Sequence, residues 1–306
     1  MPKMSLQKLL ITSTAILTIA LTNGAALAQP DFETIADEAK RLDQLQSLVV
    51  HQNGEQLFAN AFRGPALDTP VNIKSVSKTI VALLTGIAID RGIIEGPDQR
   101  VLPLLGKPAF GDDRDNLTIE HLLTMQTGLT STSGRNYGAW VNSNNWVDYA
   151  LNQPLVDSVG GRFIYSTGGW HILGAALTKA SGHSLHRLAQ DWLGNPFDIV
   201  IPPWTTDPQG RYMGGNQMAM SPLGLARIGD MVLNDGTING QEVVSQNWIE
   251  TSWEPRGLSP FSNDLYGYGW FLTEYAGQKA AYARGYGGQM LVVVPELQLS
   301  IVITSD

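Results

Sequence analysis

Strand-like runs of alternating apolar residues occur near both ends of this 306-residue chain, and helical patterns fill the stretch between them. Residues 45–75 hold two such runs around Asn53-Gly54, a dipeptide typical of a two-residue β-hairpin turn. Residues 265–306 hold about four more, whereas residues 93–250 have the spacing of helices. The pattern predicts an α+β protein, in which an antiparallel sheet split in sequence has flanking helices and an inserted all-helical region.

Capping residues and glycine stops mark where helices begin and end. We expect helices over about 31–45, 75–92, 118–128, 170–180 and 221–236, and after Ser184 and Ser245. Strands and helices do not alternate, and no Gly-x-Gly-x-x-Gly follows a first strand, which argues against a dinucleotide-binding fold.

The first 28 residues have the pattern of a cleavable secretory signal peptide. Lys3 and Lys8 provide positive charge around an apolar stretch, and Ala26-Leu27-Ala28 matches a small-x-small cleavage site. An uncleaved membrane anchor is the alternative, but it needs about 20 strongly apolar residues, and this stretch is shorter and contains several threonines. We therefore expect export to the periplasm or the medium, with residues 29–306 as the mature protein.

Composition limits the kinds of chemistry and of binding partner that the chain can have. The chain has no cysteine, which excludes disulfides, thiol chemistry and a cysteine-linked lipid anchor. Its net charge of −8 disfavours nucleic acid and anionic membranes as partners. We expect a small-molecule substrate and no membrane attachment after signal-peptide removal, while the oligomeric state stays open.

Ser75 and Lys78 form a Ser-x-x-Lys pattern at the start of the helix expected over 75–92. Three-residue spacing places both side chains on one helix face, where the lysine can take the proton that makes serine a nucleophile. The free N–H groups of the helix start would also stabilise an oxyanion. The pattern alone is weak, because the signal peptide contains a second copy from Ser5 to Lys8.

Two more segments carry candidate chemistry. Tyr165-Ser166-Thr167 precedes a helix, and a tyrosine hydroxyl beside a cationic lysine can relay protons. Taken alone, Tyr165 is better explained as a partly buried residue at a helix start. The turn from Gly285 to Gln289 lies between two late strands and lets a substrate approach the backbone closely, although a simple hairpin explains it equally well.

In order and spacing, these three segments resemble the motifs of the serine β-lactamase and penicillin-binding-protein superfamily. The resemblance is to the class C-like branch, which includes secreted esterases and 6-aminohexanoate-dimer hydrolases, and it covers residues 45–306. Ser75 to Lys78 matches Ser-x-x-Lys, Tyr165-Ser166-Thr167 stands at Tyr-x-Asn, and Gly285 to Gln289 falls at the Lys-Thr-Gly position. It implies that residues 29–306 form one β-lactamase-like serine hydrolase domain, without a cofactor or a metal.

The resemblance also assigns roles. Ser75 would be the nucleophile, Lys78 its base and Tyr165 the proton relay, with the backbone N–H groups of Ser75 and Tyr286 as the oxyanion hole. The substrate would contact six residues: Thr167, Gly285, Gly287, Gly288, Tyr137 and Trp140. For Tyr137 and Trp140, which lie in a loop that would wall the pocket, simple packing is the alternative.

The sequence departs from the family pattern in three places. Thr167 replaces the usual asparagine, and Gly285-Tyr286-Gly287 replaces the triplet whose lysine would hold a substrate carboxylate. Arg284 would substitute for that lysine only if it points into the site. The sequence stops at Asp306 directly after a strand, whereas family members usually finish with a helix packed on the sheet. We therefore expect a terminal helix to be missing, or one face of the sheet to be bare.

Other candidate sites are weaker. No Gly-x-Ser-x-Gly occurs, so an α/β-hydrolase elbow is unsupported. The remaining candidates have plain structural interpretations: surface or capping residues for His183 and His186, core histidines for His121 and His171, and a solvated turn rather than a calcium site for Asp112, Asp113 and Asp115.

The favoured function is an exported serine hydrolase that cleaves an ester or amide bond through a Ser75 acyl-enzyme. The first alternative is a β-lactamase or a D-alanyl-D-alanine carboxypeptidase. The second, from another class, is a non-catalytic protein that binds cell-wall peptide or an acyl ligand.

Overall fold

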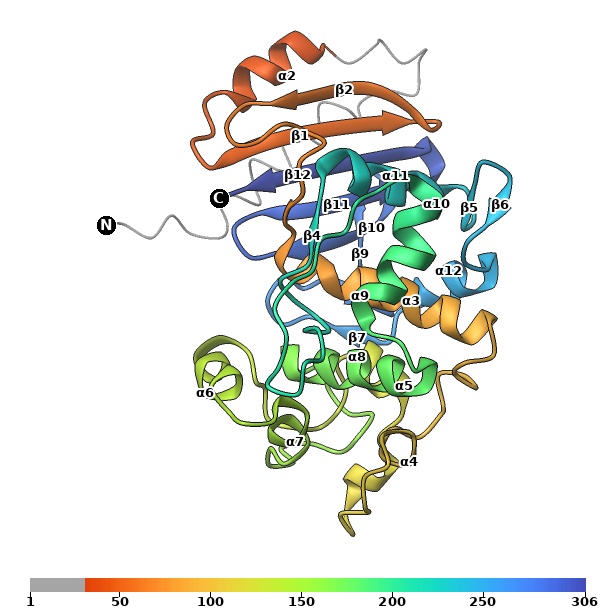
Figure 1. Ribbon diagram of the computed structural model, residues 1–306. Helices are drawn as coiled ribbons and strands as arrows, with labels where there is room; N and C mark the ends of the chain where they lie inside the picture. Colours follow the sequence, from red (N-terminus) through yellow and green to blue (C-terminus); the bar gives the residue numbers. More distant parts are fainter. Residues whose placement is uncertain (1–30) are drawn as a thin grey trace.

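The two ends of the chain meet in one eight-stranded antiparallel sheet (Figure 1). The computed structural model describes residues 31–306, so the predicted signal peptide lies outside the described residues. In spatial order the strands are β2 (Glu55–Ala61), β1 (Leu45–Gln52), β12 (Leu299–Ser305), β11 (Gln289–Val294), β10 (Gln278–Gly285), β9 (Phe271–Tyr275), β8 (Leu265–Tyr266) and β7 (Gly257–Leu258). The split antiparallel sheet is confirmed.

The sheet differs in detail from the sequence prediction. Asn53 and Gly54 have φ angles of 52° and 75° and form the expected tight turn between β1 and β2. After the helical region there are six strands in this sheet rather than about four, because β7 and β8 are too short to show alternation. The pair β3 (Val71–Asn72) and β4 (Ala219–Met220) forms a separate small sheet, so residues 71–75 do not extend the main one.

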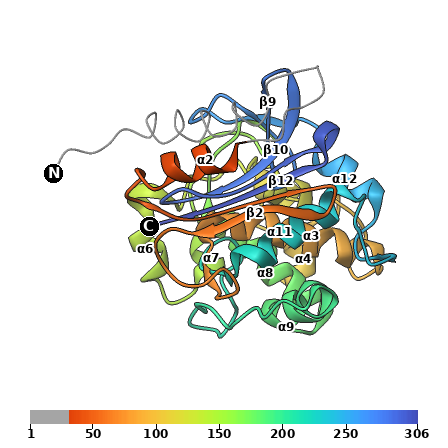
Figure 2. The ribbon, with the colours of Figure 1, turned by 90° about the horizontal axis from the view of Figure 1, so that it is seen from above.

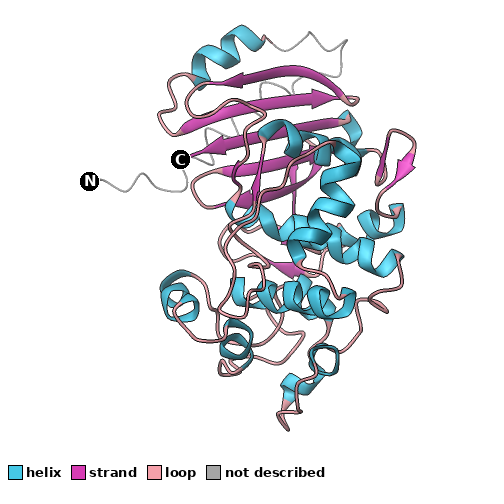
Figure 3. Cartoon of the chain, viewed as in Figure 1, coloured by secondary structure: helices cyan, strands magenta, loops and turns pink. Residues whose placement is uncertain are grey.

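Most helices gather at the end of the molecule away from β1 and β2 (Figure 3). The first part of this region holds α4 (Val101–Leu105), α5 (Ile119–Leu123), α6 (Tyr137–Val141) and α7 (Trp146–Leu151). The second holds α8 (Thr167–Ser181), α9 (Leu185–Ala189), a π-helical turn over Gln190–Gly194, and α10 (Asn195–Phe197). After these come α11 (Pro222–Leu233), the small hairpin β5 (Thr237–Ile238) and β6 (Gln241–Glu242), and α12 (Gln246–Ser252).

Side-chain caps start four of these helices where the sequence predicted. The hydroxyl groups of Thr118, Ser184, Ser221 and Ser245 each accept a backbone N–H bond from the first turn of the helix that follows. Gly182 ends α8 in the left-handed conformation. Local sequence chemistry therefore determines these boundaries.

Helix α3 (Ser77–Asp90) runs through the centre of the molecule behind a 3-10 turn, η1 (Lys74–Val76). The sequence predicted a helix over 75–92, and in it every residue from Ser77 to Ala88 is buried. Packing on several sides explains this burial, because α3 contacts α8, α9 and η1. The helix therefore fixes the start of the Ser-x-x-Lys segment within the core.

Two helices cover opposite sides of the sheet (Figure 2). Helix α11 packs on β12, β1 and β11, and α2 (Phe32–Ala39) lies on the other side, where Phe32 stacks on Phe58 of β2. All seven residues of β12 are buried, so the last strand has no bare face. Among residues 31–306, no helix is long and apolar enough to cross a membrane.

Candidate active site

Ser75 lies in the 3-10 turn η1 just before α3, with its side chain half-buried. The preceding residue, Lys74, has a φ of 49°, a left-handed conformation that disfavours a non-glycine residue by about 1 kcal/mol. Two side chains hold this turn: Asn72 Oδ1 accepts the Lys74 N–H at 2.9 Å, and Ser77 Oγ donates to the Lys74 carbonyl at 2.5 Å. Sequence patterns did not indicate this support.

Lys78 points from the first turn of α3 back to Ser75. Its Nζ atom lies 3.1 Å from Ser75 Oγ, 2.6 Å from the Gly215 carbonyl oxygen and 3.5 Å from Thr167 Oγ1. All three partners are uncharged, and the lysine is only 2% exposed. Burial lowers the pKa of Lys78 from its usual value, which favours the neutral amine that a general base requires.

Tyr165 faces the same lysine from the segment before α8. The Lys78 Nζ atom lies 4.8 Å from the centre of the tyrosine ring. Burial raises the pKa of the Tyr165 phenol, but the Lys78 charge, the Ser75 hydroxyl and the Arg284 charge lower it, and the net pKa falls below its usual value. The structure thus brings together the three residues that the sequence proposed as catalytic.

A ladder of hydroxyl groups fixes the Tyr165–Thr167 segment. Ser131 Oγ donates to the Tyr165 carbonyl at 2.6 Å. Ser133 Oγ accepts the Thr167 N–H at 2.8 Å and contacts Thr167 Oγ1 at 2.9 Å, and Thr132 Oγ1 accepts the Gly168 N–H at 2.8 Å. The start of α8 is therefore capped by a distant segment. The only sequence signal for it was the run of hydroxyl residues around position 131.

Gly285 brings the end of β10 against the turn that carries Ser75. A Cβ atom at Gly285 would lie 2.7 Å from the Ile73 carbonyl oxygen and 2.9 Å from Lys74 Cβ, so no larger residue fits without movement. Gly287 and Gly288 have φ angles of 84° and 99° and form the hairpin turn to β11, with Tyr286 at its tip and 87% exposed. This placement agrees with a backbone donor near Ser75, and the Tyr286 N–H as second oxyanion donor remains a prediction.

Arg284 lies next to this turn. Its guanidinium lies 5.6 Å from the centre of the Phe271 ring, and its positive charge helps to lower the pKa of Tyr165. The residue therefore acts electrostatically on the site.

Trp140 does not line a pocket. Its side chain is fully buried and packs with Trp146 and Met213, so the prediction of a substrate contact is wrong and the packing alternative holds. Tyr137 is half-buried at the edge of the same cluster, where its hydroxyl contacts Met213 Sδ at 3.6 Å and Asn216 Nδ2 at 3.4 Å. Thr167 is buried against Lys78 and Ser133.

The other sequence candidates have structural roles. His171 is a buried, hydrogen-bonded core histidine as expected. His121 is not a core residue: it is only half-buried and completes the cap of α5 with Thr118. His186 is partly buried beside Trp204, and its Nε2–H group donates to the Ile201 carbonyl oxygen at 2.8 Å. Within residues 31–306, no three His, Cys, Asp or Glu side chains gather as a metal site.

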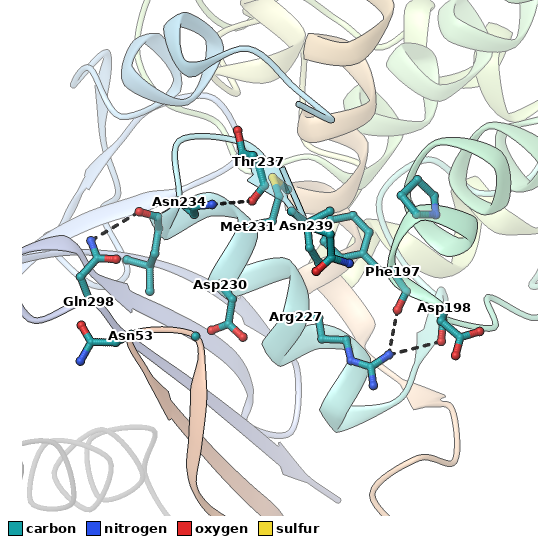
Figure 4. A pocket seen from close by; sticks show the side chains of 14 residues that line it. Asn53, Phe197, Asp198, Arg227, Asp230, Met231, Asn234, Thr237, Asn239 and Gln298 are labelled. Carbon is teal, nitrogen blue, oxygen red and sulfur yellow. Dashed lines mark hydrogen bonds between the residues drawn. The ribbon is translucent and has the colours of Figure 1, made fainter. Parts of the chain in front are cut away.

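A cavity of about 690 Å³ lies elsewhere, between the β1–β2 turn, α10, α11 and the β5–β6 hairpin (Figure 4). Arg227, Asp230 and Gln298 are among its lining residues, and none of the sequence-predicted site residues is. Asp230 pairs with His51 of β1, with 2.6 Å between Oδ2 and Nδ1. The cavity is separate from the Ser75 site.

Comparisons with known proteins identify the family of the chain. The family model described as Beta-lactamase matches residues 43–306. Over 260 residues the chain is 25% identical to the 6-aminohexanoate-dimer hydrolase of Paenarthrobacter ureafaciens, which covers 74% of this chain. The chain spans 66% of the length of that relative.

Solved structures show the same fold. The octameric penicillin-binding protein homologue from Pyrococcus abyssi superposes with a TM-score of 0.73 at 19% identity, covering 91% of this chain and 73% of that one. A family VIII carboxylesterase gives a TM-score of 0.72 at 16% identity, covering 90% and 91%. At such identities the likeness concerns the fold, and it confirms the α+β prediction.

Proposed function

Because the chain belongs to the beta-lactamase family of serine hydrolases, we propose that it cleaves an ester or amide bond through an acyl-enzyme on Ser75. The observation that carries the proposal is the Lys78 amine, buried, without a charged partner among its hydrogen bonds, and 3.1 Å from Ser75 Oγ. A lysine in this setting is a base whose pKa has moved toward neutrality.

Acylation follows from this placement. Lys78 Nζ accepts the Ser75 hydroxyl proton while Oγ forms a bond to the substrate carbonyl carbon, and the carbonyl oxygen becomes an oxyanion. Backbone N–H groups of Ser75 and the Gly285-Tyr286 turn stabilise that oxyanion. The proton then passes through Tyr165 to the leaving oxygen or nitrogen as its bond to carbon breaks, which leaves the acyl group on Ser75.

Deacylation runs the same path with water. A water molecule gives a proton to the Tyr165–Lys78 pair and bonds to the acyl carbon, and the ester bond to Ser75 Oγ breaks as Oγ regains a proton. The product acid leaves and the free amine of Lys78 is restored.

The site favours esters and simple amides over β-lactams. Gly285 stands where a lysine would bind a substrate carboxylate, and Thr167 is buried against Lys78 instead of offering a side-chain amide. The similarity to a 6-aminohexanoate-dimer hydrolase and to a carboxylesterase fold supports the same choice. Hydrolysis of β-lactams is the alternative, and the experiment must distinguish it from hydrolysis of esters and simple amides.

The test compares wild type with Ser75→Ala and with Ser158→Ala, which changes an exposed serine in a loop. Substrates are p-nitrophenyl butyrate, the linear dimer of 6-aminohexanoate and nitrocefin. We expect ester or amide turnover by wild type and Ser158→Ala, a loss of at least about 10³-fold in Ser75→Ala, and a fluorophosphonate adduct on the Ser75 peptide. Full activity in Ser75→Ala, or ligand-induced thermal stabilisation without any adduct, would overturn the proposal.

We also propose export, on the pattern of residues 1–28 alone. Mass spectrometry of the protein from the periplasm or medium of an expressing bacterium should find Gln29 as its first residue. A chain retained inside the cell with residues 1–28 attached would contradict this.

A further inference from the structure

The Gly215 carbonyl is the shortest hydrogen-bond partner of Lys78, at 2.6 Å from Nζ. It comes from a loop far along the chain, and it holds the amine together with Ser75 Oγ and Thr167 Oγ1, beside the Tyr165 side chain. If this oxygen moved, the amine would lose the contact that directs it toward Ser75. The contacts that fix this loop therefore also fix the position of the Lys78 amine.

The loop lies directly on helix α8. A Cβ atom at Gly215 would lie 2.5 Å from Trp170 Cβ, and one at Gly214 would collide with the Trp170 carbonyl oxygen. Two glycines are thus needed for the loop to approach the helix. Packing has little directionality, so a hydrogen bond to the backbone of these two glycines orients the loop more exactly than contact alone.

His171, the next residue of α8, provides that bond. Its Nδ1 atom accepts the Gly214 N–H at 3.3 Å, and its Nε2 atom lies 3.1 Å from Asp207 Oδ2. An imidazole nitrogen that accepts a backbone N–H carries no proton, so the ring is neutral and Nε2–H donates to the carboxylate. Both side chains are fully buried.

Asp207 is held firmly enough to orient the ring. Arg211 Nε donates to Oδ2 at 2.7 Å, and the backbone N–H groups of Gln209 and Arg211 donate to Oδ1 at 2.9 Å each. Burial raises the pKa of Asp207, but the bonds from His171 and Arg211 outweigh it and lower the pKa to about 2. Asp207 therefore remains a charged acceptor for His171.

We propose that His171 is a positioning residue for the general base: through the Gly214 N–H it fixes the Gly215 carbonyl, which holds the Lys78 amine against Ser75. This inference rests on the proposed function. His171 touches neither Ser75 nor Lys78 in any hydrogen bond described above, and its charged neighbours are Asp207 and Arg211. The titratable group facing Lys78 is Tyr165, on which Arg284 also acts.

Two substitutions separate the bonds of His171. In His171→Gln the side-chain amide reaches the position of Nε2 and keeps the hydrogen bond to Asp207, but the Gly214 N–H loses its acceptor. In His171→Asn the amide oxygen takes the position of Nδ1 and keeps the hydrogen bond from the Gly214 N–H, but the bond to Asp207 is lost. His51→Gln is the matched control, because it breaks another buried His–Asp pair, with Asp230, outside the site.

The readout is the rate of fluorophosphonate labelling of Ser75 between pH 5 and 10, with thermal unfolding measured in parallel. For His171→Gln we expect labelling about tenfold slower. Its acid limb should move about half a unit lower, because the ammonium of Lys78 loses an acceptor. We expect His171→Asn within about threefold of wild type and His51→Gln within about twofold.

Each other outcome overturns the inference. If His171→Gln has the pH profile of His51→Gln at equal folded fraction, His171 is merely structural. If labelling of Ser75 slows as much in His171→Asn as in His171→Gln, the hydrogen bond to the Gly214 N–H is not the one that positions the base. Should His171→Gln fail to fold, a labelling rate of His171→Asn more than about threefold below wild type overturns the inference by itself. If wild type is not labelled on Ser75, the proposed function itself fails, and the two failures are therefore distinct.

Discussion

The Lys78 amine lies 4.8 Å from the centre of the Tyr165 ring, although the two residues come from different segments of the fold. Each alters the titration of the other. The tyrosine interaction raises the pKa of Lys78 against the larger effect of burial, and the lysine charge lowers that of the phenol. The two titrations are therefore coupled: the interaction favours the proton on the Lys78 amine and the ionised form of the Tyr165 phenol.

Replacing the base should separate activity from stability. Lys78 is buried without a carboxylate among its hydrogen-bond partners, which disfavours the folded state whenever the amine is charged. We expect Lys78→Met to lose at least about 10³-fold in ester hydrolysis. We also expect it to be as stable as wild type or up to about 2 kcal/mol more stable at pH 7.

Hydrolysis rates and urea unfolding at pH 7 and pH 9 measure both effects. The folded pKa of Lys78 lies below its unfolded value, so wild type should gain stability as pH rises toward 10.5, and Lys78→Met should lack this part of the gain. A Lys78→Met protein that is clearly less stable than wild type at both pH values would contradict the prediction.

Removing only the Tyr165 hydroxyl tests the proton relay. Tyr165→Phe keeps the ring over Lys78, so we expect an unchanged thermal midpoint and a kcat about 10²- to 10⁴-fold lower. Because interaction with Tyr165 raises the pKa of Lys78, its removal should move the acid limb of the rate profile to lower pH. Steady-state rates between pH 5 and 10 give both quantities, and an unmoved limb would argue against electrostatic coupling.

The sequence predicted the local features of this molecule because they depend on local chemistry. Thr118, Ser184 and Ser245 cap helices where they were expected, and Asn53-Gly54 forms its turn. The order of motifs predicted the family, and with it the gathering of Ser75, Lys78 and Tyr165.

Long-range contacts were beyond the sequence alone. Nothing near Gly215 in the chain indicates that its carbonyl meets Lys78, since the two residues are 137 positions apart. Trp140 was expected to wall a pocket because its loop is rich in Gly, Ser and Asn, but aromatic neighbours from α7 bury it. Residue types alone do not distinguish an aromatic pocket wall from an aromatic core.

Gly285 should tolerate no side chain. In Gly285→Ala the new Cβ would meet the Ile73 carbonyl oxygen and Lys74 Cβ, so β10 or the Ser75 turn must move. If the Tyr286 N–H is the proposed oxyanion donor, we expect a loss of about tenfold or more in kcat/KM, since small displacements of such a donor cost that much.

The matched control is Gly138→Ala in α6, where a Cβ meets nothing within 4 Å. It should keep full activity and equal or slightly exceed wild type in thermal stability, because alanine favours helix more than glycine does. If the two alanine variants behave alike, close approach at Gly285 does not matter for catalysis.

Acid should destabilise the protein partly through Asp207. Its pKa is lowered to about 2 in the folded state, whereas an unfolded aspartate titrates near 3.9. As pH falls from about 5, the unfolded state binds the proton first, so this stabilisation is present above the unfolded pKa and is lost as pH falls through the folded one. The shift corresponds to about 2 kcal/mol at pH 7. Burial also lowers the pKa of His171, so the unfolded state binds this proton first as well. Protonation of His171 therefore adds a further loss of stability as pH falls, and this loss begins at a higher pH than that of Asp207.

We therefore expect Asp207→Asn to be less stable than wild type at pH 7 by about 2–4 kcal/mol. The difference in free energy of unfolding should narrow between pH 5 and 3, because in this range wild type loses the stabilisation from the ionised Asp207 carboxylate, which the variant lacks at every pH. Urea unfolding followed by tryptophan fluorescence across pH 3–7 measures the two curves. Asp191→Asn, which removes an exposed partner of Arg187, should run parallel to wild type. Parallel curves for Asp207→Asn and wild type would show that Asp207 is not the group whose protonation weakens the fold in acid.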